Sequence, residues 1–372
     1  MKPMKILSLF DGMSCGMIAF RQAGIPVEEY HAYETDKYAV ATSKHNFPEI
    51  VHHGNVFDGD FTQYRGFDWL IGGSPCTYWS IAQSPEKRET VASGIGWELF
   101  QQYVRALHEA KPKFFLYENN FSMADAIRES ISETFRFEPI MIDSATVTAQ
   151  TRKRLYWAGI RNENGTYSKC LTPPLLDKGL LVRHILDGNG IPIGAVKGKA
   201  QTLKAQYGKN GFLNFVGYHS TYGATGVATP IQIGALARPD GELSKSQAFR
   251  IYSVDGKAVT LKANGGGAGG KTGLYAVESS HTNAYEVRNG KITYKQGKYP
   301  IKLDDGYYII RKLSVQECMK LQTVPKWYEF PVSNAQAYRM LGNGWTVDVI
   351  RHLIESTLTG KTEPSYLQLA FV

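Results

Sequence analysis

The sequence contains few cysteines and no long apolar run. Its four cysteines are Cys15, Cys76, Cys170 and Cys318. None forms a C-x-x-C pair, which argues against a disulfide framework and against a cysteine zinc cluster. No stretch of about 18 apolar residues occurs, so we expect no membrane-spanning helix. Asp11 and Gly12 interrupt the first apolar run too early for a signal peptide. We therefore expect a cytoplasmic protein without a metal, in which any cysteine with a special role acts as a free thiol.

Outside one segment, the chain has no excess charge of either sign. Residues 163–306 contain 18 Lys/Arg and 10 Asp/Glu, a net of +8, and the rest of the chain contains 24 of each, a net of zero. The same segment contains 23 of the 37 glycines, which is typical of loops and turns. We interpret residues 163–306 as a domain inserted between residues 1–162 and 307–372. Its basic surface favours a nucleic-acid partner, although basic loops can also be merely solvated.

The first 160 residues alternate short apolar runs with helix-compatible segments. The runs are KILSLF, EEYHAYE, EIVHHGNV, FDWLIGG, KFFLYE and FEPIMI, and the helix-compatible segments are residues 36–46, 97–110 and 122–134. This alternation is typical of a mostly parallel sheet with covering helices. We predict an α/β fold of this kind, to which the inserted segment adds a glycine-rich, mainly β domain.

Polar residues stand at the ends of five successive predicted strands. They are Asp11-Gly12, Glu34, Asn55, Pro75-Cys76 and Glu118-Asn119. Ligands of open parallel sheets bind beyond the carboxyl ends of the strands, so these residues predict one shared site. A lone cysteine after an apolar strand is more often a core residue. The other four strand ends are what favours a functional role for Cys76.

Six short motifs resemble those of the cytosine-5 DNA methyltransferases, and they occur in that family's order. They are LFDGMSCG, YETDKYA, GSPC, YENN, QTRKR and LGNGWTV. The long gap after QTRKR lies where the family keeps its target-recognition domain. DWLIGGSPC, PIMIDSATV and GWTVDVIRHL look closest to the de novo branch of animal enzymes and its bacterial and phage relatives. The chain departs from the pattern at Ser14 and Cys15, which replace glycines, at Asn55, which replaces an Asp, and at Asn120, which replaces a Val.

The resemblance implies a Rossmann-like methyltransferase fold and methyl transfer from S-adenosylmethionine to carbon 5 of a cytosine flipped out of duplex DNA. Carbon 5 is a poor nucleophile until a thiolate adds to carbon 6, and Cys76 is the expected nucleophile. Glu118 is expected to neutralise ring nitrogen 3, because a partly desolvated carboxyl can hold a proton near neutral pH. Arg154, supported by Arg152, is expected to donate to carbonyl oxygen 2. A phosphate contact is the alternative for both arginines.

The resemblance also implies a binding site for S-adenosylmethionine. The expected cofactor-binding residues are Phe10, Asp11, Gly12, Ser14, Gly16, Glu34, Thr35, Asn55, Val56, Pro75, Asn343 and Trp345. Backbone N–H groups of the turn after the first strand can approach the methionine part, and Glu34 can accept both ribose hydroxyls. Phe10 is expected to face the adenine and Asn55 to accept its amino hydrogen. For these two, a core position and a turn position are the alternatives.

An internal repeat in the basic segment predicts contacts with DNA. GKAQTLKA at residues 198–205 and GKAVTLKA at residues 256–263 each suggest a turn followed by a short strand before a glycine-rich stretch. We expect Lys199, Lys204, Lys257 and Lys262 to include phosphate contacts, and Ser80 to be a further DNA contact. The alternative is a structural hairpin whose lysines are only solvated.

Three other functions compete with DNA methylation. GGGAGGKT at residues 265–272 fits the phosphate-loop pattern, but the β-like sequence after it lacks the helix that this motif requires. A tRNA cytosine-5 methyltransferase would share the Cys and Glu motifs, and the large basic insert argues against it. An inactive DNA-binding relative would not need Cys76, Glu118 and Arg154 together. We therefore expect a monomeric DNA (cytosine-5-)-methyltransferase that acts on double-stranded DNA, with a cognate restriction endonuclease as a candidate partner.

Overall fold

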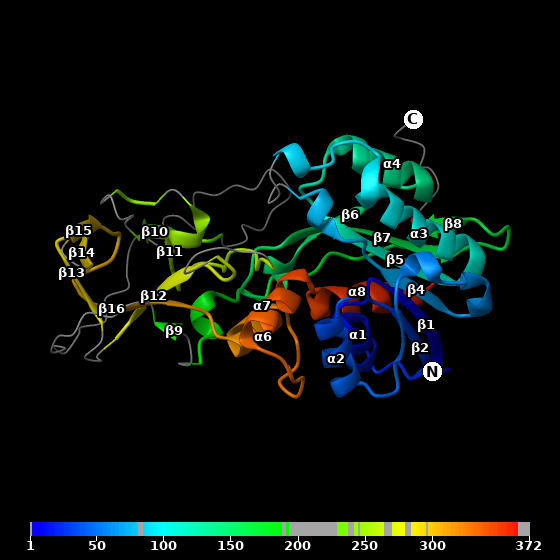
Figure 1. Ribbon diagram of the computed structural model, residues 1–372, viewed down its shortest axis with the longest axis horizontal. Helices are drawn as coiled ribbons and strands as arrows, with labels where there is room; N and C mark the ends of the chain where they lie inside the picture. The colour runs from blue at the N-terminus through cyan, green and yellow to red at the C-terminus, as the bar shows by residue number, and fades with distance from the viewer. Residues whose placement is uncertain are drawn as a thin grey trace.

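A computed structural model describes residues 2–80, 85–187, 191–192, 229–236, 242–244, 246–263, 270–279, 284–294 and 297–363. These residues form two eight-stranded sheets. Figure 1 shows the sheets toward opposite ends of the longest axis, with helices gathered around the first sheet. No helix in the described part is long and apolar enough to cross a membrane.

The first sheet has the strand order β3-β2-β1-β4-β5-β7-β6, and β8 pairs with β7. Its strands are β1 (Met4–Leu9), β2 (Val27–Tyr33), β3 (Val51–His53), β4 (Trp69–Gly72), β5 (Phe114–Asn120), β6 (Ile140–Asp143), β7 (Lys153–Arg161) and β8 (Tyr167–Lys169). The first five strands are mutually parallel, which confirms the predicted sheet. Strand β7 is antiparallel to β5 and β6, and the alternation of apolar runs did not predict it.

Helices cover both faces of this sheet (Figure 1). They are α1 (Cys15–Gln22), α2 (Lys37–Asn46), α3 (Gly94–Ala110), α4 (Asp125–Phe135) and α8 (Val347–Leu358). Phe20, Trp69 and Ile350 belong to one buried apolar cluster, whereas Phe100 and Ile131 belong to another. The two clusters place α1 and α8 on one face and α3 and α4 on the other. The three predicted helical segments correspond to α2, α3 and α4.

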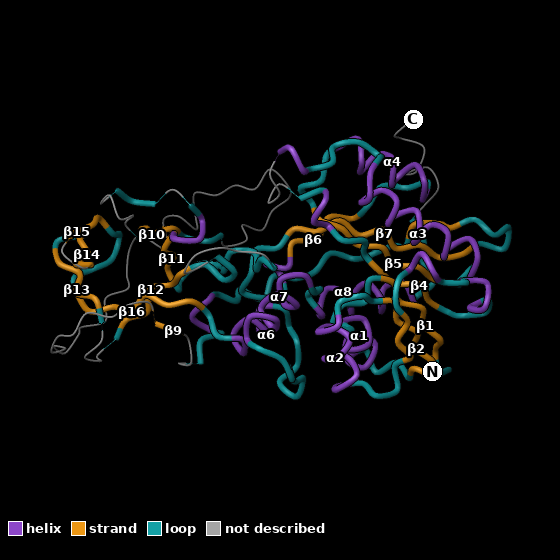
Figure 2. The backbone as a smooth tube through the Cα atoms, in the orientation of Figure 1, coloured by secondary structure: helices purple, strands orange, loops and turns teal. Residues whose placement is uncertain are grey.

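The second sheet has the order β10-β11-β12-β16-β13-β14-β15, and β9 pairs with β16. Its strands are β9 (Ile191–Pro192), β10 (Gln232–Ala235), β11 (Arg250–Ser253), β12 (Leu274–Glu278), β13 (Tyr285–Arg288), β14 (Lys291–Tyr294), β15 (Gly297–Pro300) and β16 (Gly306–Lys312). All its pairings except β11–β12 are antiparallel. Figure 2 shows these strands in orange in the lobe away from the N-terminus. The mainly β insert is thus confirmed.

The expected boundaries at residues 162 and 306 do not coincide with the limits of the two sheets. Strand β8 belongs to the first sheet although it follows residue 162, and β16 extends the second sheet to Lys312. The chain then returns through α6 (Val315–Leu321) and α7 (Asn334–Asn343) to α8. Strand β12 begins directly after Gly273, so the helix that a phosphate loop at residues 265–272 would need is absent there.

The second copy of the internal repeat joins the two lobes. It forms no strand, but Ala258 makes an isolated bridge to Gln150. The Ala258 N–H donates to the Ala149 carbonyl at 2.6 Å, and the Thr151 N–H donates to the Ala258 carbonyl at 3.0 Å. The Thr260 hydroxyl donates to the Thr151 carbonyl at 2.6 Å. A turn does lead into this copy, with a bend at Gly256, but the expected strand is wrong, and the copy instead pairs with the segment that precedes β7.

Candidate active site

The carboxyl ends of β2, β1, β4 and β5 lie next to one another. Leu9 is in register with Tyr33 of β2 and with Gly72 of β4, and Gly72 is in register with Tyr117 of β5. The residues that follow these positions must therefore meet at one edge of the sheet. This edge is where the predicted carboxylates and the predicted thiol come together.

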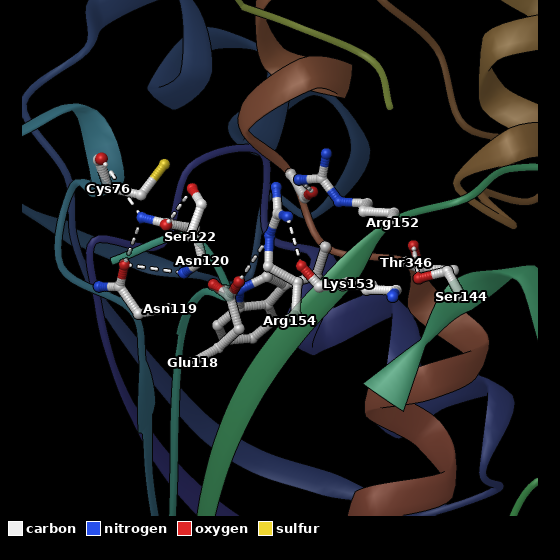
Figure 3. A network of polar contacts seen from close by, with 12 residues as sticks. Cys76, Glu118, Asn119, Asn120, Ser122, Ser144, Arg152, Lys153, Arg154 and Thr346 are labelled. Carbon is white, nitrogen blue, oxygen red and sulfur yellow. Dashed lines mark hydrogen bonds and ion pairs between the residues drawn. The ribbon is translucent and has the colours of Figure 1, made fainter. Parts of the chain in front are cut away.

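Two asparagines hold the loop that carries Cys76. Cys76 is partly buried and begins a short 3₁₀ turn after β4. Asn119 donates from Nδ2 to the Ser74 carbonyl at 3.1 Å, and Asn120 donates from Nδ2 to the Cys76 carbonyl at 3.5 Å. A Cβ at Gly73 would lie 2.6 Å from the Glu118 carbonyl oxygen, so only glycine permits this close approach of the loop to β5. Figure 3 shows the contact of Asn120 with Cys76.

The charges around Cys76 have opposing effects on its thiol. Burial raises the pKa of Cys76, the positive charge of Arg154 lowers it, and the negative charge of Glu118 raises it. The net direction is upward, so the thiol is protonated at neutral pH before substrate arrives. In Figure 3 the Cys76 sulfur and the Arg154 guanidinium point to the same side of the view. Arg154 is thus the group placed to stabilise a thiolate.

Two donors hold the Glu118 carboxylate. Arg154 Nε lies 3.1 Å from Glu118 Oε1, and both side chains are mostly buried. Trp345 Nε1 donates to Glu118 Oε2 at 2.9 Å. Arg154 also donates from Nη1 to the Lys153 carbonyl at 2.8 Å. A carboxylate with a donor on each oxygen has a fixed orientation, and here it sits at the same edge as Cys76.

Arg152 supports the site from within the protein. Its side chain is 2% exposed, and its Nη2 donates to the carbonyls of Gly344 at 2.8 Å and Gly342 at 3.1 Å. Its Nη1 donates to the Leu261 carbonyl at 3.4 Å. Burial and the charge of Arg154 lower the pKa of Arg152 to about 10. Neither a contact with the base nor the alternative phosphate contact fits this burial. Arg152 instead connects the start of β7 to residues 342–346, called here the GNGWT loop.

Backbone hydrogen bonds hold the Glu34 carboxylate in place in the expected cofactor region. Its Oε2 accepts from the Gly12 N–H at 2.8 Å, and its Oε1 accepts from the N–H groups of Thr35 and Asp36, both at 2.7 Å. Burial raises the pKa of Glu34, and these backbone donors oppose that rise. Gly12 has φ +59°, which glycine adopts without strain. The two turns after β1 and β2 are therefore tied together through one carboxylate.

The side chains of Asp11 and Ser14 face the protein interior, and Gly16 packs closely against it. Asp11 Oδ1 accepts from Ser8 Oγ at 2.5 Å and from the Tyr30 hydroxyl at 2.6 Å. Ser14 is buried, and its hydroxyl contacts Asp11 and the Ser43 hydroxyl. A Cβ at Gly16 would clash with Ile71. A direct cofactor contact through the Ser14 side chain does not fit this burial, whereas the expected approach of backbone N–H groups from this turn stays a prediction.

The other expected cofactor residues lie around the same edge. Phe10 is half-buried at the end of β1 with φ +58°. Asn55 is exposed, and its Oδ1 accepts from the Phe57 N–H at 3.2 Å, which is the turn position weighed as its alternative. Val56 is buried, and its carbonyl accepts from Arg105 Nη2 at 2.9 Å. Thr35, Pro75 and Asn343 are exposed as well.

The lysines expected to contact DNA lie in different surroundings. Lys257 is 0% exposed, and its Nζ donates to the carbonyls of Ala145 at 2.7 Å and Thr148 at 3.1 Å. A phosphate contact by Lys257 is therefore wrong. Lys262 is half-buried, and burial together with the charge of Arg250 lowers its pKa. Lys199 and Lys204 lie outside the described residues.

Ser80, the other expected DNA contact, donates its N–H to the Cys76 carbonyl at 3.0 Å.

Sequence reasoning assigned no role to Trp79 or Asn120, which shape the site. Trp79 is buried and donates from Nε1 to Glu89 Oε2 at 3.0 Å, which anchors the loop after Cys76. Asn120 stood out in the sequence only as a departure from the family pattern. Within the described ranges no group of three His, Cys, Asp or Glu side chains is arranged to hold a metal ion.

Comparisons with known proteins agree with this arrangement. The family model for C-5 cytosine-specific DNA methylase matches residues 4–359. The orphan methyltransferase M.SPRI of Bacillus phage SPR is 33% identical over 175 residues, so the match spans 44% of this chain and only 39% of that protein. The type II methyltransferase M.HhaI of Haemophilus parahaemolyticus is 25% identical over 365 residues, or 94% of this chain and 93% of that protein.

The fold also has solved relatives. The methyltransferase EhMeth of Entamoeba histolytica superposes with a TM-score of 0.60 at 14% identity, and the match covers 98% of this chain and 100% of that one. At this identity the likeness shows the fold alone. The family match, which spans nearly the whole chain, shows more. The chain belongs to the C-5 cytosine-specific DNA methylase family, as its six motifs predicted.

Proposed function

We propose that the protein is a DNA (cytosine-5-)-methyltransferase that uses S-adenosylmethionine and acts on a cytosine flipped out of duplex DNA. The observation that carries this proposal is the meeting of Cys76, Glu118 and Arg154 at one edge of the sheet, where Arg154 Nε is 3.1 Å from Glu118 Oε1. A nucleophile, a carboxyl and a cation in one partly buried site match the needs of a ring that must be activated before it reacts.

In the proposed mechanism Cys76 attacks the base first. The thiol loses its proton to water, the thiolate forms a bond to carbon 6, and the carbon 5–carbon 6 π pair becomes available at carbon 5. Arg154 opposes the burial that raises the pKa of Cys76, so it favours the thiolate at this step. Glu118 faces ring nitrogen 3 and neutralises the charge that develops there, while Arg154 donates to carbonyl oxygen 2. Loss of the carbon-5 proton after methylation restores the ring double bond and releases Cys76.

The turn residues suit the proposed cofactor. S-adenosylmethionine, when bound, supplies an electrophilic methyl group. Glu34 offers a carboxylate that is already oriented by three backbone N–H groups, and its Oε2, which accepts only one of them, retains a lone pair for a ribose hydroxyl. Exposed Asn55 follows β3 and half-buried Phe10 follows β1, two strands apart at the same edge of the sheet, where they can contact an adenine.

A tRNA cytosine-5 methyltransferase would share the Cys and Glu motifs, so the test compares two substrates. The purified full chain is incubated with radiolabelled S-adenosylmethionine and either duplex DNA of mixed sequence or total tRNA. We expect label in DNA and none in tRNA. Transfer to tRNA alone would replace the proposed substrate, and label in neither would refute the proposed activity. Size-exclusion chromatography of the same preparation tests the expected monomer.

A further inference from the structure

Trp345 was expected to bind the cofactor, but its indole contacts the candidate catalytic carboxyl. Its Nε1 donates to Glu118 Oε2 at 2.9 Å across 227 positions of sequence. The other oxygen of the same carboxyl, Oε1, is 3.1 Å from Arg154 Nε. The two Glu118 oxygens therefore have different partners, one from β7 and one from the loop between α7 and α8.

The backbone on both sides of Trp345 is fixed by buried groups. The Gly344 carbonyl accepts from Arg152 Nη2 at 2.8 Å and from Gln322 Nε2 at 3.2 Å. The Thr346 hydroxyl donates to Gln322 Oε1 at 2.9 Å. Arg152, Gln322 and Thr346 are each at most 2% exposed. These buried contacts fix the backbone on both sides of Trp345 and so hold its indole in one position.

We propose that Trp345 is a positioning residue that ties Glu118 Oε2 so that Oε1 faces the flipped cytosine. The inference rests on the proposed function, in which Arg154 turns to the base carbonyl. When Arg154 does so, it releases Oε1, whereas Trp345 keeps its contact with Oε2. An indole N–H only donates, so Oε2 stays an acceptor and the proton that Glu118 shares with ring nitrogen 3 resides on Oε1.

This role also explains what Arg152 does for catalysis. Arg152 is buried, yet it holds the carbonyls of Gly342 and Gly344 directly before Trp345. The loop between α7 and α8 thereby orients the carboxyl that acts on the base. Arg152, just before β7, thus binds the loop that carries Trp345, and Trp345 in turn binds Glu118.

The test is Trp345→Phe in the full chain, which keeps an aromatic ring and removes the N–H. We expect kcat for DNA methylation to fall by roughly 10- to 100-fold, the loss typical of one hydrogen bond to a charged group. The dissociation constant for S-adenosylmethionine, measured by titration calorimetry, should change by less than about threefold, within the range of context effects on one contact. Trp327→Phe is the matched control, because Trp327 is 50% exposed and should leave both quantities unchanged.

Two further readouts separate positioning from general damage. In a Glu118→Ala background, single-turnover assays should show little further loss from Trp345→Phe, because the partner is gone. Trp345→His keeps a ring N–H and should recover part of the activity.

The outcomes distinguish the inference from the proposed function. If wild-type protein does not methylate DNA, the proposed function fails. If wild type is active but Trp345→Phe weakens cofactor binding with kcat unchanged, Trp345 is a cofactor residue and the inference fails. Additive losses in the Glu118→Ala background, or a Trp345→His variant no better than Trp345→Phe, would also overturn it.

Discussion

Replacing Lys257 by Met should weaken the junction between the two lobes without weakening DNA binding. The ammonium is fully buried and donates to the Ala145 and Thr148 carbonyls, with Asp177 Oδ1 at 3.9 Å. Met has a similar length and leaves both carbonyls without this donor, at about 1–3 kcal/mol each. Removal of the buried charge offsets part of this loss of stability. Burial lowers the pKa of Lys257 and so disfavours its charged form.

The expected net loss for Lys257→Met is about 2 kcal/mol, which corresponds to a decrease of roughly 3 °C in Tm for a chain of this size. Differential scanning calorimetry measures it, with exposed Lys326→Met as the matched control, which should change Tm by less than about 1 °C. DNA affinity measured against salt completes the test. An unchanged Tm together with a fall of roughly 0.9 in the slope of log affinity against log salt would restore the phosphate contact and refute this account of Lys257.

Two other predictions concern the catalytic edge. Because burial raises the pKa of Cys76, alkylation of this thiol by iodoacetamide without DNA should be slow at pH 7 and should accelerate above pH 9, later than for an ordinary cysteine of pKa about 8.5. Peptide mass spectrometry follows the modified residue, and fast alkylation at pH 7 would contradict the burial argument. Glu118→Gln keeps the shape of the side chain and removes the transferable proton, so kcat should fall at least about 100-fold while cofactor affinity is retained. Equal losses of kcat and cofactor affinity would mean that Glu118 maintains structure instead of acting on the base.

The periodicity of apolar residues and the polar residues at strand ends were enough to predict the first sheet and one edge of it. Alternation of apolar runs with helical segments predicted the parallel sheet, because strands buried on both faces have continuous apolar sequences such as WLIG in β4. The same logic predicted that Cys76 and Glu118 share one edge of the sheet. Strand β7 escaped prediction because its first residues matched a motif, and a motif says nothing about secondary structure or strand direction.

Long-range contacts could not be predicted from local patterns. Arg152 and Arg154 are two residues apart, yet one is buried against the GNGWT loop and the other faces Glu118. Only the packing of α7 and β7 decides between these directions. The two copies of GKA-x-TLKA look equivalent as sequence, but the segment that pairs with Ala258 decides that Lys257 is buried. Trp345 and Glu118 are 227 positions apart, and no local pattern links them.

The central proposal is that Cys76 adds to carbon 6 of a cytosine in DNA and so enables the methylation of carbon 5. Nucleoside mass spectrometry of DNA from a host without cytosine-5 methylation, expressing either the wild-type chain or Cys76→Ser, tests it most directly. We expect 5-methyldeoxycytidine with the wild type and none with Cys76→Ser, at equal expression of both proteins. Equal amounts of the modified nucleoside from both strains would contradict the proposed role of Cys76, and its absence from both would contradict the proposed activity.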